Sequence, residues 1–131
     1  MAVNWLAIFL AALSAFVLGG LWYSPLLFSK VWLRLSGAAE SSTKALPMPV
    51  ILGGSFVLSF IAAFVFAMFL GPRPGLTFAL GAGSSAGLCW VATSFGINYL
   101  FERKPLGLWL INGAYHTLQF TLYGLVLGLM G

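Results

Sequence analysis

Long uncharged runs dominate this sequence and restrict what it can fold into. Four runs carry no charged side chain: residues 3–23, 49–70, 76–101 and 106–130. Each is as long as the roughly 20 apolar residues that an α-helix needs to cross the hydrocarbon core of a bilayer. The runs show no strand alternation and are too long for the strands of a membrane barrel. The sequence therefore predicts an all-α integral membrane protein, a single transmembrane domain over residues 1–131 with four transmembrane helices in a bundle.

Composition excludes several other classes of protein. Charged residues make up 6% of the chain and hydrophobic residues 61%, whereas about a quarter of a soluble domain is charged. A soluble domain, a disordered chain and a nucleic-acid-binding module are excluded, so no nucleic-acid partner is expected. One cysteine, one histidine and two acidic residues are too few for a disulfide framework or a usual metal site. We expect no metal, no cofactor and no enzymatic activity, and we assign no catalytic residue.

The basic residues predict how the chain is oriented. Five of the six lie in the first and third connections, and the second connection carries Arg73; the five are Lys30, Arg34, Lys44, Arg103 and Lys104. By the positive-inside rule, residues 24–48 and 102–105 are cytoplasmic and both termini lie outside. No basic residue precedes the first run, which is too long for the core of a signal peptide, so we expect an uncleaved helix. Aromatic residues near the ends of the spans are predicted interfacial anchors; they include Trp5, Trp22, Tyr23, Tyr99 and Trp109.

A short amphipathic segment follows the first span. Residues 26–35 come directly after Pro25, where a helix is expected to break. Lys30 and Arg34 are four residues apart and share one helical face. This pattern is typical of a helix in the membrane interface, and Lys30, Arg34 and Trp32 are the predicted contacts to anionic lipid headgroups. The alternative is that the first span continues, with its basic side chains reaching the surface.

Each span carries small residues at four-residue spacing. They are Ala7, Ala11, Ala15 and Gly19; Ser55, Ser59, Ala63 and Ala67; Ala79, Gly83 and Gly87; and Gly113, Thr117 and Thr121 followed by Gly124 and Gly128. Helices in a bilayer associate where small residues let their backbones approach. These stripes predict a tight bundle. They leave open whether the stripes face the same chain or a neighbouring copy, and a homo-oligomer is expected.

The fourth span carries the most polar row of the chain. His116 is the only readily titratable side chain within a span and falls near mid-bilayer, and Asn112, Gln119 and Tyr123 share about the same face. Asn98 lies nearer the cytoplasmic interface on the third span. Polar groups at this depth must face protein or water. One interpretation is a polar pathway or ligand site in which His116 carries a proton. The other is that these groups only hydrogen-bond neighbouring helices together.

Three segments of the chain carry a family resemblance. They are Val3-Asn4-Trp5-Leu6-Ala7, then Gly20-Leu21-Trp22-Tyr23-Ser24-Pro25 with Lys30 and Trp32 following, and Gly96-Ile97-Asn98-Tyr99-Leu100-Phe101-Glu102-Arg103 leading into Leu108-Trp109-Leu110-Ile111-Asn112. Over nearly its whole length the chain resembles an uncharacterised bacterial family of small membrane proteins, called domain of unknown function 1761. The resemblance implies a four-helix, multi-pass protein of the bacterial inner membrane. It brings no reaction, substrate or catalytic residue.

Two classes of function are left open. One is a homo-oligomeric channel or transporter for protons or a small solute, with its polar site on the fourth helix. The other is a non-catalytic accessory or scaffold subunit of a larger membrane complex.

Overall fold

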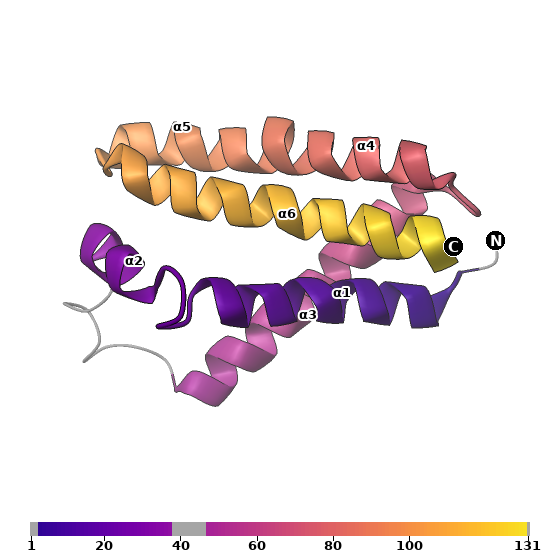
Figure 1. The fold of residues 1–131 in the computed structure, drawn as a ribbon, viewed down its shortest axis with the longest axis horizontal. Coiled ribbons are helices and arrows are strands. Elements are labelled where there is room, and N and C mark those ends of the chain that lie inside the picture. The colour runs from indigo at the N-terminus through magenta and orange to yellow at the C-terminus, as the bar shows by residue number, and fades with distance from the viewer. Residues whose placement is uncertain (1–2, 38–46, 131) are drawn as a thin grey trace.

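The computed structural model describes residues 3–37 and 47–130, and every regular element within these ranges is helical (Figure 1). In chain order the elements are α1 (Trp5–Trp22), α2 (Ser29–Ser36), α3 (Met48–Leu70), α4 (Leu76–Ala86), the π-helical segment η2 (Gly87–Ala92), α5 (Thr93–Glu102) and α6 (Leu106–Met130). The predicted all-α fold is confirmed. The four long helical rods begin and end within about two residues of the four uncharged runs.

Three of these rods are long and apolar enough to cross a membrane, counting the described residues. They are Trp5–Trp22, Met48–Leu70 and Leu76–Glu102, and the last is formed by α4, η2 and α5 without a break. We call this continuous helix the third rod. α6 has 25 residues but is less apolar, because the polar row runs along its middle. A multi-pass membrane protein is therefore supported by three spans.

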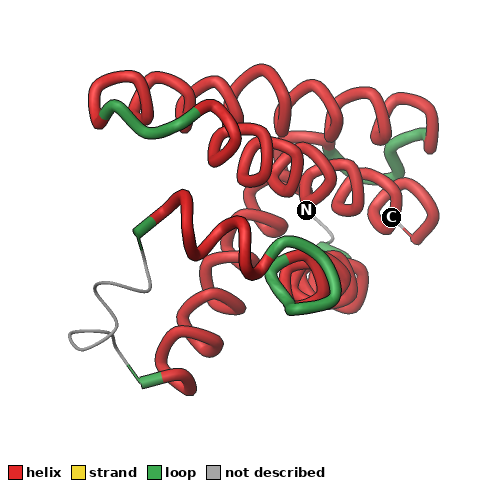
Figure 2. The backbone as a smooth tube through the Cα atoms, turned by 60° about the vertical axis from the view of Figure 1, so that its left-hand side comes forward, coloured by secondary structure: helices red, strands yellow, loops and turns green. Residues whose placement is uncertain are grey.

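α6 lies at the centre of the structure. It packs along α1 on one side and along the whole third rod on the other, and α3 crosses obliquely behind α1 (Figure 1). Figure 2 shows that the N-terminal half of α3 runs out away from the other helices, and the side chains of residues 48–55 are exposed. The N-terminal end of α1 and the C-terminal end of α6 lie together at one end of the molecule, and α2 lies at the other.

Most of the small-residue stripes face other helices of the same chain, and Ser55, in the exposed first half of α3, does not. Ala7, Ala11 and Ala15 are fully buried under α3 and α6. The backbones of α4 and α6 approach more closely still. A Cβ added at Gly83 would lie 2.2 Å from the carbonyl oxygen of Phe120, and one added at Gly124 would lie 2.2 Å from that of Ala79. The tight packing that the stripes predict is therefore an interaction of the third rod with α6.

The π-helical turn lies where the third rod meets the middle of α6. A Cβ added at Gly87 would lie 2.6 Å from the carbonyl oxygen of His116, so only glycine allows this approach. Side-chain hydroxyls of the next turn cover the backbone of the π turn: Thr93 Oγ1 donates to the Cys89 carbonyl at 2.6 Å, and Ser94 Oγ to the Trp90 carbonyl at 2.6 Å. Short π segments of this kind often occur beside functional sites.

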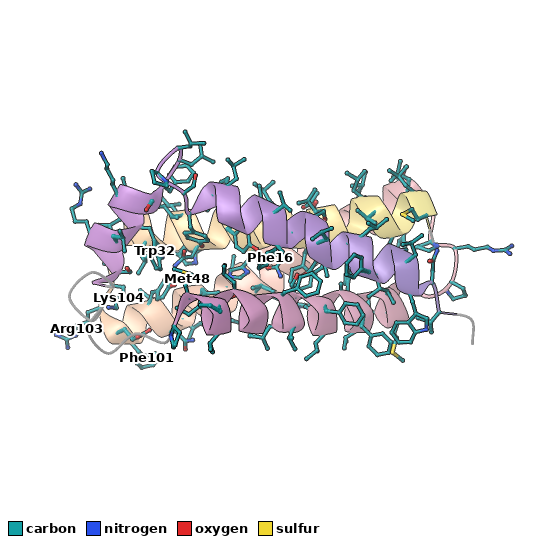
Figure 3. All side chains as sticks on the ribbon, turned by 90° about the horizontal axis from the view of Figure 1, so that it is seen from below. Phe16, Trp32, Met48, Phe101, Arg103 and Lys104 are labelled. Atoms are coloured by element: carbon teal, nitrogen blue, oxygen red, sulfur yellow. The ribbon has the colours of Figure 1, made fainter. Side chains whose placement is uncertain are left out.

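The first helix, α1, ends as the sequence predicts, and a new helix begins as α2. Lys30 and Arg34 are exposed on α2. Trp32, expected to contact headgroups, is half-buried and packs edge-on against Tyr23, with ring centroids 5.4 Å apart. Lys104 Nζ donates to the Ser36 carbonyl at 3.4 Å. Figure 3 shows Trp32 of α2 beside Arg103 and Lys104 of the α5–α6 connection at this end of the molecule. We call it the α2 end. Of the residues used to predict the orientation, Lys44 lies outside the described residues.

Candidate functional site

The polar row of α6 faces the interior of the bundle. Asn112, Gln119 and Tyr123 are buried, and His116 is half-buried. The structure thus brings four of the five candidate site residues onto one face of one helix. Their side chains form two hydrogen-bonded groups, an inner group around Tyr123 and an outer group around Asn112 nearer the α2 end.

The inner group runs from α6 to α3 and α1. His116 Nδ1 lies 2.5 Å from Gln119 Oε1, and Gln119 Nε2 donates to the Tyr123 hydroxyl at 2.7 Å. The Tyr123 hydroxyl lies 2.7 Å from Ser59 Oγ, which donates to the Ala12 carbonyl at 3.2 Å. Tyr123 is fully buried, so this row of hydrogen bonds joins three helices through a hydroxyl that water does not reach.

The order of donors in this row, with the Gln119 amide placed as the structure has it, matches one tautomer of neutral His116. Because the amide nitrogen of Gln119 donates to Tyr123, its oxygen is the atom that faces His116. That oxygen can only accept, so Nδ1 of the neutral ring carries the hydrogen and Nε2 carries the lone pair. The row therefore presents His116 as a proton acceptor at Nε2.

Nε2 of His116 has no hydrogen-bond partner among the described residues, whereas Nδ1 is bound. Every buried side-chain nitrogen or oxygen of the described residues has a hydrogen-bond partner, and Nε2 has none among these residues, so it is not fully enclosed. The ring itself is held in place. Phe95 stacks on it with centroids 4.8 Å apart and planes 13° from parallel, and Tyr115 meets it edge-on at 5.0 Å.

The outer group joins α1 to α5 through α6. The Tyr23 hydroxyl donates to Asn112 Oδ1 at 2.5 Å, and Asn112 Nδ2 donates to the Tyr99 hydroxyl at 2.7 Å. Beside it, the Tyr115 hydroxyl donates to the Ala15 carbonyl at 3.0 Å. Tyr23 and Tyr99, predicted as interfacial anchors, instead turn their hydroxyls inward. With Tyr123, all four tyrosines of the chain hydrogen-bond within the bundle.

Asn98 does not join either group. It is exposed on α5, and its neighbour Tyr99 is the residue that reaches Asn112. The sequence analysis missed Tyr23, Tyr99 and Ser59 as members of the site. Ser59 was visible only as a small residue in a stripe, and a tyrosine at the end of a span has the same sequence signal whether its hydroxyl faces inward or outward.

The described residues offer few other chemical groups. They contain no cluster of three or more His, Cys, Asp or Glu side chains that would hold a metal ion. Cys89 is exposed, and no hydrogen bond links it to His116. What the site offers is one imidazole nitrogen that can accept a proton or a donor group, set in a row of neutral amides and hydroxyls.

Comparison with known proteins bears on the whole chain. The family described as a protein of unknown function (DUF1761) matches residues 6–128. The chain belongs to the DUF1761 family. The resemblance found in the sequence is therefore confirmed, and both hydrogen-bonded groups on α6 lie within the part that matches DUF1761. No curated protein and no solved structure matches the chain.

Proposed function

We propose that this DUF1761 member is a four-span membrane protein in which α6 is the fourth span. Its 25 residues make a helix about 37 Å long, enough to cross a bilayer of about 30 Å. The packing against α1 and the third rod supports this, because it turns the polar row away from lipid. An even number of spans also agrees with the N-terminal end of α1 and the C-terminal end of α6 lying together.

The charges support a direction of insertion. Lys30 and Arg34 on α2 and Arg103 and Lys104 after α5 all lie at the α2 end, whereas Arg73 lies at the opposite end. Under the positive-inside rule the α2 end is cytoplasmic and both termini lie outside. We propose a bacterial inner membrane as the location.

The function that the geometry supports best is transport of a proton or a small solute through a site at His116. The observation that carries this proposal is that Nε2, at the end of a hydrogen-bonded row whose donors point away from it, has no partner among the described residues. A proton or a donor group of a solute can bind Nε2 while Nδ1 stays bonded to Gln119. Placing an ionisable side chain within a membrane span costs free energy. Such side chains commonly mark proton or solute paths. Because four helices enclose little interior, we propose that a homo-oligomer supplies the rest of the path.

A second candidate is a non-enzymatic accessory subunit of a larger membrane complex. The buried members of the polar row, Asn112, Gln119 and Tyr123, are satisfied within the chain. In an accessory subunit, the only task of this row is to hold α1, α3, α5 and α6 together. The outer surface of the bundle then binds the partner. In this case His116 has no role in transport.

Proton flux into liposomes tests the two candidates. The purified protein is reconstituted with a pH-sensitive dye inside the vesicles, and wild type is compared with His116→Ala. We expect wild type to conduct above protein-free vesicles and His116→Ala to lose most of that flux. Asn98→Ala is the matched control, because Asn98 is an exposed polar residue outside both groups, and it should conduct like wild type. Circular dichroism and size-exclusion chromatography show that each variant is folded.

The outcomes separate the candidates. If a folded His116→Ala protein keeps its proton flux, the proposed role of His116 in transport is wrong. Absence of proton flux in wild type, and of counterflow of small solutes, would favour the accessory subunit. Mass spectrometry of the gently extracted protein should then find it together with other membrane subunits rather than as a homo-oligomer.

A further inference from the structure

A pocket lies at the end of the molecule opposite α2. Its volume is about 210 Å³, and residues from the start of α1, the end of α3, the α3–α4 loop and the end of α6 surround it. The buried side chains of Ile8 and Leu127 line its inner part. Ala67, Met68 and Leu70 of α3 add apolar wall. The pocket therefore offers an apolar interior at the level where the spans end.

The polar side chain of Asn4 holds two of these walls together. Its Oδ1 accepts from the backbone N–H of Ala7 at 3.0 Å and so caps α1, while its Nδ2 donates to the Met130 carbonyl at 2.9 Å near the end of α6. Both polar atoms of the Asn4 amide are thus already hydrogen-bonded within the protein. A ligand of this pocket would meet apolar side chains inside and the α3–α4 loop at the rim.

That loop places a single cation at the rim. It runs Gly71-Pro72-Arg73-Pro74-Gly75, and its two prolines restrict the backbone on either side of Arg73. Arg73 is exposed and has a φ of 51°, a left-handed conformation that is costly for a residue other than glycine. Glu102, the acidic residue that the structure describes, lies at the α2 end. The positive charge of Arg73 therefore has no acidic side chain near it among the described residues.

We propose that this pocket binds an anionic phospholipid, with part of an acyl chain inside and the phosphate at Arg73. An apolar interior with a cation at its rim matches the two parts of such a lipid. The pocket opens where a span meets the headgroup region, so lipid is the amphiphile at highest local concentration there. The inference requires that the chain lies in a membrane, which three apolar rods support, and it does not depend on transport through His116.

Lipid titration followed by native mass spectrometry tests the proposal. The protein in detergent is titrated with phosphatidylglycerol or with phosphatidylcholine of the same acyl chains, and the dissociation constant of the first bound lipid is measured. One basic residue near a membrane surface accounts for about a fivefold change in affinity for an anionic lipid. We expect Arg73→Gln to weaken binding of phosphatidylglycerol about fivefold, with no change for phosphatidylcholine, and Arg73→Lys to bind nearly as wild type does.

Two further variants separate this site from general attraction of anionic lipid. Arg103→Gln removes an exposed arginine from the α2 end that is not one of the predicted headgroup contacts, and it should leave the first binding event unchanged. Ala67→Leu fills the pocket and should weaken binding of both lipids, provided circular dichroism shows a folded protein. If Ala67→Leu does not fold, the comparison of Arg73→Gln with Arg103→Gln still decides, because both arginines are exposed in loops outside the packed helices.

Three results would overturn the proposal. Arg73→Gln could bind phosphatidylglycerol as tightly as wild type, or Arg103→Gln could weaken binding as much as Arg73→Gln does. In a competition experiment, water-soluble glycerol phosphate could displace phosphatidylglycerol at equal concentration, which would show that the anion alone is recognised and that the apolar pocket takes no part.

Discussion

Replacing Gly83 by alanine tests the closest helix contact in the structure. The new Cβ would lie 2.2 Å from the carbonyl oxygen of Phe120, whereas Cβ contacts rarely fall below 3.4 Å, so α4 and α6 must separate by about 1.2 Å (3.4 minus 2.2). The clashing atom belongs to the backbone of α6, so no side-chain rotation relieves it. The hydrogen bond between Ser84 Oγ and Thr121 Oγ1, now 2.9 Å, would lengthen past 3.5 Å by the same movement.

The expected loss of stability follows from these two effects. Overpacking of this kind costs about 1–3 kcal/mol, and a hydrogen bond between membrane helices contributes about 0.6 kcal/mol. Alanine recovers about 0.5–1 kcal/mol through its better helix propensity. We therefore expect Gly83→Ala to lower the free energy of unfolding by about 1–3 kcal/mol. Gly124→Ala should behave alike, since its Cβ would lie 2.2 Å from the Ala79 carbonyl oxygen.

Gly81→Ala is the matched control, on the same helix and two residues away. A Cβ at Gly81 would have no heavy atom within 4 Å, so the protein should be unchanged or slightly more stable. The assay is reversible unfolding from mild detergent into sodium dodecyl sulfate, followed by tryptophan fluorescence. If Gly83→Ala proves as stable as Gly81→Ala, the close approach of α4 and α6 is wrong.

Three further predictions address the polar groups and the third rod. Tyr123→Phe should cost about 0.6–1.7 kcal/mol in the same unfolding assay, because it leaves Gln119 and Ser59 without their shared partner. A Tyr123→Phe, Ser59→Ala double variant should lose less stability than the sum of the two single variants, and full additivity would contradict the contact. Asn112→Ala should destabilise the protein by a similar amount, since it releases both Tyr23 and Tyr99, while a control with Asn98→Ala should change it by less than about 0.5 kcal/mol, as exposed sites do. Cys89, exposed near the middle of the third rod, should stay unlabelled by maleimide in intact membranes, because the reactive thiolate does not form in the hydrocarbon core, and it should be labelled once the protein is unfolded in sodium dodecyl sulfate; labelling in sealed membranes would place this residue outside the hydrocarbon core.

The helices could be predicted from the sequence because their signal is local. An uncharged run long enough for a bilayer is visible without knowing its neighbours, and the runs coincide with the rods within about two residues. Pro25 and the amphipathic pattern after it likewise predicted that the helix ends before α2. The π-helical turn at residues 87–92 had no such signal, because it depends on how Gly87 meets the backbone of α6.

The candidate site was predicted only in part. The row on α6 follows from helical spacing within one segment, so Asn112, His116, Gln119 and Tyr123 could be grouped from the sequence. The partners that complete it, such as Ser59 and Tyr99, come from other helices and are selected by how the helices are rotated against one another. The exposed position of Asn98 beside the inward-facing Tyr99 reflects that rotation.

The sequence by itself determined that this protein is helical, that three of its segments are long and apolar enough to cross a membrane and that one helix carries a polar face, since each property depends on the composition and period of a single segment. The tertiary structure alone decided that the glycine stripes of the third rod and α6 meet within one chain, and that the row on α6 ends in a nitrogen of His116 with no hydrogen-bond partner among the described residues. It also decided that an apolar pocket lies beside Arg73. These depend on contacts between segments far apart in the chain, and in lipid such contacts are selected by shape and by hydrogen bonding rather than by hydrophobicity, which is nearly uniform along this sequence.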